Sequence, residues 1–578
     1  MNPKILFENN SSGEHPTSLE NSKEDSSKEG SPFERIFSYP IERLIKKYVS
    51  YLTIKPTGEF TPIHVDEIAS KIAFVYEKIR KIIDWKEDNL LRRNAIERIL
   101  KRKLISEISK LDFIFKVDID QIGEPLVLEL IRGGHLPNDK IPQEKVVEVQ
   151  RIINKYFNIL KNAPFSTSGS NFVFKKRINF SDWIIEIAAC EIEEILSPPV
   201  KENTLIETMT AIMNERIRII PAEALSEEEK IEQTYIAVHQ TLFDLDDGIT
   251  TYHLLKYKYP NWTNPPQEFL KQITKDIFKI WKEIEDELSH PLSKEFFNIC
   301  EKTDTAFTLL SDTLDSLKNQ PEKISQIIAD RSQFKELITN FYNKRLQTLK
   351  SRLFKLAIFS TLSVFVANWF TFFIVEIPLA KLFYEGFNFF TAAVDFIVPS
   401  LAMFILVAII RPPAKSNQEK VIDLVFNFVY ESGGKDMFEI KLKKKKRPLT
   451  IFIVSLFYLI ACFLSFGVVA GVFYKAGLPI TSVVFDTLTI AINVFAALII
   501  RNKAKEITVE EKTTFWEFLL DILFLPVAQV GSWLGNKWRE YNVVAVFFNV
   551  VIEMPFVTLI EFVEDWRNFL KEKKAEIH

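Results

Sequence analysis

The stretch from Leu353 to Arg501 constrains this chain most, because its apolar residues come in solid runs rather than in stripes. A membrane hydrocarbon core about 30 Å thick takes roughly 20 apolar residues of helix, and each run is of that length. We predict spans at about residues 353–377, 388–410, 449–474 and 480–500. The chain is therefore expected to be an integral membrane protein with a large soluble part in front.

Composition limits the rest of the fold. Phe is abundant, at 50 residues, and Gly is scarce, at 16, which favours helices with aromatic cores. A net charge of −3 gives no support to nucleic acid as a partner. The three cysteines are widely separated and make neither a disulfide framework nor a zinc-binding spacing. The predicted fold class is mainly α, with a cytoplasmic helical domain, a four-helix transmembrane region and C-terminal amphipathic helices.

The chain divides by composition into consecutive segments. A polar N-terminal segment is expected to be disordered, and the domain after it leads through a helical stalk into the membrane. A tail follows in which prolines and charges interrupt the apolar residues. The segments are 1–31 (disordered), 32–320 (cytoplasmic helical domain), 321–352 (stalk), 353–507 (transmembrane region) and 508–578 (amphipathic helices at the interface or, alternatively, re-entrant helices).

Periodic apolar residues predict two helices early in the soluble domain, over His64–Trp85 and Lys86–Lys110. In the second helix, Ile96 and Leu100 belong to the apolar stripe. The opposite face is basic, and acidic residues interleave the charges, so we predict a solvated face or one that leans toward anionic lipid. The basic residues of that face are Arg92, Arg93, Arg98, Lys101, Arg102 and Lys103.

The stretch 111–180 is less regular and allows a small sheet. Alternating residues around Phe113–Val117 suggest a short strand, and Pro125–Ile131 reads as a strand or as a short helix that ends at glycine. The segment Asn171–Asn179 is a candidate to pair with one of them. Helices are expected to resume at Ser181, a residue type that favours helix N-caps.

Prolines then divide the chain into helices over Gln267–Ser289, Pro291–Asn319 and Pro321 onward, because proline is tolerated in the first turn and breaks a helix interior. Neither glycine nor proline occurs between Pro321 and Pro378. We therefore predict one continuous helix from the soluble domain into the first span.

The distribution of basic residues predicts the orientation. Lysines and arginines cluster before the first span, between the second and third, and after the fourth, which places those segments and both termini in the cytoplasm. The expected location is the inner membrane of a bacterial-type cell. The densest run can also bind anionic lipid headgroups; it consists of Lys441, Lys443, Lys444, Lys445, Lys446 and Arg447.

Two aspartates are the candidate functional residues of the membrane region. Asp395 precedes Arg411 by 16 residues and Asp486 precedes Arg501 by 15, so the two pairs of spans look like a repeat. Both aspartates are expected a turn or two inside the outer edge, where an ionisable group is costly and suggests an ion or proton pathway. The alternative is that they reach the headgroups or bond to Asn368, Ser400 or Thr489.

A second cluster, weighed as a metal site, collects around one turn of the soluble domain. Histidines and aspartates are metal ligands, but a capping box formed by Ser226 and Glu229 and a regular apolar face favour an ordinary helix end. The residues are His239, Asp244, Asp246, Asp247 and His253. We assign no catalytic, cofactor-binding or metal-binding residue.

The sequence supports more than one class of function. We favour a non-enzymatic, membrane-anchored scaffold or binding protein with a protein partner that no residue names. The alternative is a small transporter or channel that uses Asp395 and Asp486. An enzyme is the least favoured class, because no catalytic constellation can be assembled. Four spans with few polar contacts suggest that a second copy is needed, which makes a homo-oligomer an option.

Overall fold

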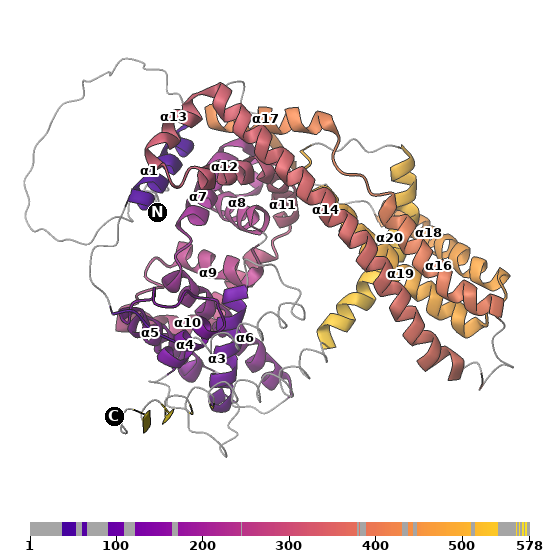
Figure 1. Cartoon of the computed structure of the whole chain (residues 1–578), viewed down its shortest axis with the longest axis horizontal. Helices are drawn as coiled ribbons and strands as arrows, with labels where there is room; N and C mark the ends of the chain where they lie inside the picture. The colour runs from indigo at the N-terminus through magenta and orange to yellow at the C-terminus, as the bar shows by residue number, and fades with distance from the viewer. Residues whose placement is uncertain are drawn as a thin grey trace, which may run out of the picture. The chain divides into compact units, whose positions relative to one another are not determined.

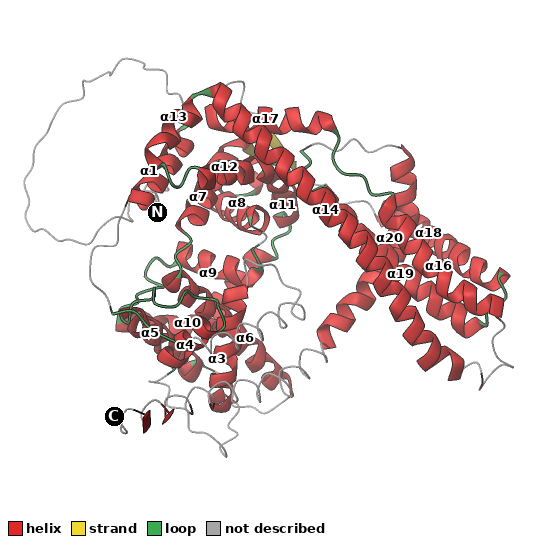
Figure 2. Ribbon diagram, viewed as in Figure 1, coloured by secondary structure: helices red, strands yellow, loops and turns green. Residues whose placement is uncertain are grey.

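The computed structural model describes residues 37–53, 61–65, 91–108, 122–164, 171–243, 245–378, 381, 389–430, 437–442, 448–509 and 515–541, and six single positions in the tail (562, 566, 569, 570, 573 and 574). The segment 1–31, most of the helix predicted for 64–85 and the basic positions 443–447 lie outside these residues. The described part is mainly helical, as predicted, and contains one two-stranded sheet (Figure 1, Figure 2).

The soluble helices bury two hydrophobic clusters. The first cluster is formed mainly by α3 (Leu91–Ile108), α4 (Gly123–Arg132), α5 (Glu144–Asn162), α6 (Asn171–Leu196), α9 (Asp247–Lys258) and α10 (Gln267–Leu288). The second cluster is formed mainly by α1 (Tyr39–Thr53), α7 (Val200–Arg216), α8 (Glu227–Leu242), α11 (Ser293–Glu301), α12 (Asp304–Ser316) and α13 (Ile324–Ala329), with short 3₁₀ turns at η4 (Ala222–Ala224) and η5 (Pro321–Lys323).

Local sequence signals place several of these helices correctly. Helix α10 begins after Pro266, as predicted, and buries one apolar face, with Ile277 and Ile284 fully inside. The capping box at the start of α8 is present, because Ser226 accepts from the Glu229 backbone and the Glu229 side chain accepts from the Ser226 backbone. The helix predicted for Pro291–Asn319 is instead two helices, α11 and α12. At the break, the Thr303 hydroxyl donates to the Cys300 carbonyl oxygen at 2.9 Å.

The predicted strand at Phe113–Val117 lies outside the described residues, and no β-strand forms in the described part of 111–180. Pro125–Ile131 belongs to α4, which ends at Gly133 as the second alternative predicted, and Asn171–Asn179 is the first part of α6. Ser181 therefore lies inside α6 and caps nothing. The sheet pairs β1 (Ile217–Ile220) with β2 (Phe438–Lys441) in parallel. Periodicity within a short window cannot predict a pairing between strands so far apart in the chain.

Four helices are long and apolar enough to cross a membrane, as predicted. They are α14 (Arg331–Thr371), which continues as the π-helical turn η6 (Phe372–Glu376), α16 (Phe389–Ala408), α18 (Pro448–Lys475) and α19 (Ile480–Ala504). Helix α19 contacts the other three membrane helices. Half of its most apolar stretch is buried, whereas only 6% of the most apolar stretch of α18 is buried. We call this assembly the membrane bundle, and α19 is its central helix.

Helix α14 runs without a break from the soluble helices into the membrane bundle (Figure 1). It begins at Arg331 rather than at Pro321, because Asp330 caps it by accepting from the backbone of Ser332 and Gln333. At 1.5 Å per residue, α14 and η6 together extend about 70 Å. The continuous helix predicted from composition is therefore present, with a later start.

The segment between α16 and α18 is built into the soluble part. Helix α17 (Lys415–Tyr430) buries Val421, Val425 and Phe428 in the second cluster, and β2 then pairs with β1. Phe428 stacks on Phe307 of α12 with ring centroids 5.0 Å apart. The soluble core thus includes residues that composition assigns to a membrane loop.

The tail helix α20 (Phe515–Tyr541) packs on α19 and α18. Asp521 pairs with Arg501 at 2.5 Å, and a Cβ added at Gly531 would overlap the carbonyl oxygen of Ala491. These contacts move forward along α20 and backward along α19, so the two helices are antiparallel. Helix α20 therefore packs lengthwise along α19, and the choice between an interfacial and a re-entrant tail stays a prediction.

Candidate functional site

Three carboxyl groups meet at the end of the membrane bundle farthest from the soluble helices. Asp395 and Asp486 each follow the first residue of their helices by six positions, and Glu376 ends the π-helical turn that extends α14. All three are buried, with exposed fractions of 1% for Asp395 and 3% for Asp486 and Glu376. We call these residues the acid cluster.

The members of the acid cluster lie beside one another. The Asp395 carboxyl group is close enough to those of Glu376 and Asp486 to interact electrostatically with both. A hydrogen bond between two carboxyl groups needs a proton on one of them, because two carboxylates have only acceptor atoms. The Ser482 hydroxyl, from the first turn of α19, donates to Glu376 Oε2. Three acids from three membrane helices therefore meet in one buried cluster.

The acid cluster lacks a basic partner in the described part of the chain. No lysine, arginine or histidine there forms an ion pair with Glu376, Asp395 or Asp486. Two buried oxygens, Asp395 Oδ1 and Asp486 Oδ2, accept no hydrogen bond. Three like charges this close would repel one another strongly in a low-dielectric setting. Protons or a bound cation must therefore neutralise the cluster.

Pro399 accounts for the position of the polar residue Asn368 beside the acid cluster. Pro399 lies inside α16 and has no N–H, so the main-chain carbonyl of Asp395, four residues earlier, loses its helical hydrogen bond. Asn368 Nδ2 of α14 reaches that oxygen at 3.5 Å. Ser400, another of the three predicted partners, bonds to the Phe396 carbonyl oxygen in its own helix. Neither side chain neutralises the aspartate carboxyl group.

The sequence identified two of the three acids. It placed Asp395 and Asp486 inside the span ends by counting residues to the arginines, and the structure brings them together. It missed Glu376 and Ser482. Glu376 is the second-last residue of the first predicted span, so it reads as a charge at the membrane edge, and the π-helical turn that extends α14 there has no simple sequence signal.

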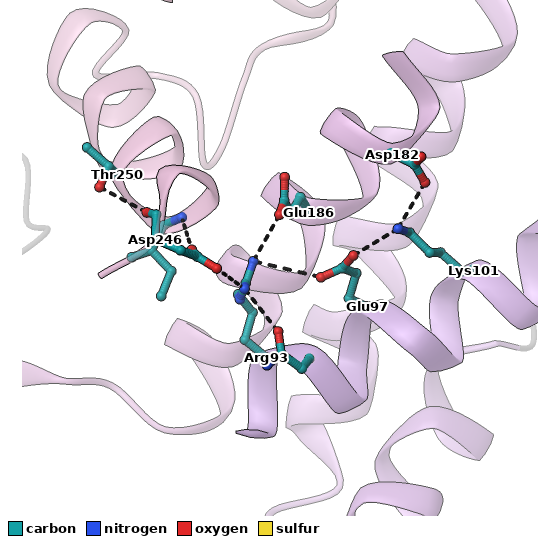
Figure 3. Close-up of polar contacts among 9 residues, drawn as sticks. Arg93, Glu97, Lys101, Asp182, Glu186, Asp246 and Thr250 are labelled. Atoms are coloured by element: carbon teal, nitrogen blue, oxygen red, sulfur yellow. Dashed lines mark hydrogen bonds and ion pairs between the residues drawn. The ribbon is translucent and has the colours of Figure 1, made fainter. Parts of the chain in front are cut away.

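The soluble domain contains a different cluster of charges around Arg93, shown in Figure 3. The Arg93 side chain is fully buried on α3, so the predicted solvated face is wrong there. It pairs with Asp246 at the N-terminus of α9, with Glu186 of α6 at 3.4 Å and with Glu97 of α3 at 3.8 Å. Lys101 continues the network to Glu97 and Asp182, each at 2.9 Å.

The Arg93 network is structural in character. Asp246 also caps α9 by accepting from the Ile249 backbone, and Gly248 leaves no room for a Cβ against Glu186 and Arg93. Burial raises the pKa of Glu186, and Arg93 opposes that rise. Burial also raises the pKa of the neighbouring Glu193 to about 7. Every formal charge here faces an opposite one, which joins α3, α6 and α9.

The residues weighed as a metal site do not converge. Asp246 binds Arg93, Asp247 accepts from Gln240 at 3.4 Å, and Asp244 lies outside the described residues. Within the described residues, no group of three or more histidine, cysteine, aspartate or glutamate side chains is arranged to hold a metal ion.

The two histidines of that region, His239 and His253, instead pack against each other, with ring centroids 4.7 Å apart and ring planes tilted by 31°. His239 is buried, and neither ring nitrogen has a hydrogen-bond partner among the described residues. Burial lowers the pKa of His239 well below its usual value and that of His253 to about 3. Both rings are therefore neutral at pH 7.

The basic run between the second and third spans is only partly described. Lys441 is exposed at the end of β2 and pairs with Glu439 at 2.9 Å. Lys443, Lys444, Lys445, Lys446 and Arg447 lie outside the described residues. Binding of anionic lipid at this run stays a prediction.

No protein-family model, curated protein or solved structure matches this chain. Fold and site therefore define it only at the level of class. It is a helical membrane protein with a large soluble helical part and a buried acid cluster in its apolar helices.

Proposed function

We propose that this chain is a multi-pass membrane protein that moves protons through the acid cluster. The observation that supports the proposal is the contact between Asp395, Asp486 and Glu376, which are buried in apolar helices without a basic partner in the described residues. Of the two functions predicted from the sequence, the small transporter or channel now has the stronger support.

A simple anchor or scaffold gains nothing from this arrangement. An ionisable side chain at the centre of a membrane helix costs about 2.5–3.5 kcal/mol on insertion scales. An acid cluster without a basic partner is therefore expected only where the acids take part in the function of the protein. A proton is the favoured ligand because neighbouring carboxyl groups can bond to one another only through a proton, which could then pass along Glu376, Asp395 and Asp486.

The orientation is part of the proposal. Lys350, Arg352 and Lys355 are exposed on α14 near its entry into the membrane bundle, and Arg501 and Lys503 lie at the exit of α19. Positive charges at these ends favour a cytoplasmic soluble part in an inner membrane. The acid cluster, at the opposite end of the bundle, would then lie near the outer face and exchange protons with the outside.

The test uses the full chain reconstituted in liposomes with a pH gradient and an internal pH-sensitive dye. We expect proton flux from the natural protein, and a loss of about a hundredfold in Asp395→Asn, Asp486→Asn and Glu376→Gln. Asp423→Asn is the matched control, because Asp423 is exposed on α17 and away from the cluster. It should keep the natural flux.

Other outcomes would contradict the proposal. Sodium or potassium flux without proton flux would overturn the assignment of the proton. No flux of any of these ions would leave the membrane-anchored scaffold as the better account. Infrared spectroscopy gives a readout independent of transport, because a protonated carboxyl band that shifts in heavy water should weaken in each cluster variant and persist in Asp423→Asn.

A further inference from the structure

The Asn417 side chain lies where the soluble helices meet the membrane bundle. It is buried near the start of α17, with an exposed fraction of 6%. Its Nδ2 donates to the Tyr342 hydroxyl at 2.9 Å and to the Ile507 carbonyl oxygen at 2.7 Å. Its Oδ1 accepts from the Val509 backbone at 3.0 Å. The amide thus uses both of its N–H groups and its oxygen.

These bonds join three separate parts of the chain. Tyr342 belongs to α14, and Ile507 and Val509 belong to the segment that leaves α19. Asn417 itself follows α16 by nine residues. Because α14, α16 and α19 carry Glu376, Asp395 and Asp486, each acid lies on a helix whose other end leads to this one amide.

Neighbouring contacts fix the same segment to the soluble core. Ile507 is buried in the second hydrophobic cluster, and the Thr305 hydroxyl of α12 donates to the Glu506 carbonyl oxygen at 3.2 Å. The segment that leaves α19 is therefore attached to α12, α14 and α17 together. It has little freedom to move unless Asn417 or its partners move.

The intervening helices are suited to transmit a displacement. Ala504 follows Asp486 by 18 residues along α19, which is about 27 Å of helix. Tyr342 precedes Glu376 by 34 residues along α14 and η6, or about 50 Å. A continuous helix moves nearly as a rigid rod, so a change at the Asn417 end alters how the carboxyl groups meet at the other end.

We propose that Asn417 is a positioning residue for the acid cluster, and that through it the state of the soluble domain controls how Glu376, Asp395 and Asp486 are arranged. This inference deepens the proposed function and rests on it for the flux measurement. The effect of Asn417 on the arrangement of the helices near the acid cluster can be measured whether or not the protein moves protons.

The experiment compares Asn417→Ala, which removes all of these bonds, with Tyr342→Phe, which removes only the bond to α14. Ser38→Ala is the matched control. Its buried hydroxyl donates to the Phe428 carbonyl oxygen, so it also binds α17 but makes no hydrogen bond to α14 or to the segment that leaves α19 in the described residues. Spin labels at the exposed positions Ile374 and Ile480 report the separation of α14 and α19 near the acid cluster. Cys462 is replaced by Ser to avoid a third label.

We expect Asn417→Ala to broaden the distance distribution and to lower proton flux about tenfold or more, since small misplacements of reacting groups are costly. Tyr342→Phe should do the same to a smaller extent, and it guards against a folding failure in the alanine variant. Ser38→Ala should change neither measurement.

An unchanged distance distribution in both Asn417→Ala and Tyr342→Phe would overturn the inference. So would equal changes in Ser38→Ala, because they would indicate general loosening of the soluble core. If the distances change while even the natural protein shows no flux of any ion, the proposed function fails and the positioning role of Asn417 stands.

Discussion

The Arg93 network and the acid cluster are both buried groups of charged residues, but they are built in opposite ways. Around Arg93, each positive side chain faces carboxylates from other helices (Figure 3). In the acid cluster, three carboxyl groups face one another without a basic partner in the described residues. A compensated cluster can hold a fold together, whereas an uncompensated one must take up a ligand. The contrast separates a structural cluster from a candidate functional one.

The largest expected effect is a loss of stability when the Arg93 network is broken. Arg93→Met should lower the free energy of unfolding by about 3 kcal/mol, because it leaves the partly buried carboxylates of Asp246 and Glu186 without their buried partner. Thermal unfolding of the purified full chain, followed by circular dichroism, measures the change. The double variant Arg93→Met with Asp246→Asn should recover part of the loss. A variant as stable as the natural protein would show that the network is not structural.

His239 and His253 test whether the soluble part also contains buried titratable groups without an oppositely charged partner. Because their folded-state pKa values lie below the usual 6.5, the folded protein binds fewer protons than the unfolded chain in weak acid. Stability is therefore full above pH 6.5 and is lost as the pH falls, by about 2 kcal/mol per histidine between pH 7 and pH 5. Glu193, with its raised pKa of about 7, acts in the opposite direction.

The difference between two proteins isolates the histidine contribution. His239→Phe keeps a ring of similar shape and removes one titrating group, so its unfolding temperature should fall less than that of the natural protein between pH 7 and pH 5. Parallel pH profiles for the two proteins would contradict the explanation.

In the acid cluster, by contrast, a substitution that removes a charge should leave the fold intact. Asp486→Asn should keep stability or raise it by about 1 kcal/mol, because it relieves repulsion among neighbouring acids. This is the reverse of the result for Arg93→Met, and the same unfolding experiment in detergent measures both. A large loss of stability in Asp486→Asn would make the acid cluster structural and would remove the contrast.

The smallest expected effect concerns the neutral donor in the cluster. Ser482→Ala removes the hydroxyl that bonds to Glu376, and a typical hydrogen bond of about 1 kcal/mol corresponds to roughly a fivefold lower proton flux. Thr487→Val is the control, because its hydroxyl bonds to the Val483 carbonyl of its own helix. Equal flux in both variants would mean that Ser482 does not take part.

Features set by neighbouring residues were predictable from the sequence. The apolar runs predicted the four membrane helices. Pro266 predicted the start of α10, and Ser226 with Glu229 predicted the start of α8. Each depends on interactions within a few turns of chain, which spacing reports directly.

Features that depend on distant contacts were not predictable. Arg93 occupies a polar position of its helix, and only the arrival of Asp246 and Glu186 makes that position interior. The pairing of β1 with β2 and the bonds of Asn417 likewise join residues far apart in the chain. At the candidate site, spacing found Asp395 and Asp486 but could not show that they meet, nor that Glu376 joins them.

The place of α17 and β2 in the soluble core has a consequence for biosynthesis. A ribosome that has made residues 37–350 has not yet made Val421, Phe428 or Ile440, which complete the second hydrophobic cluster. The soluble part therefore cannot finish folding until two membrane helices have emerged and the third is about to follow. Expression of the soluble residues alone would leave that cluster open, so studies of this protein should keep the chain whole.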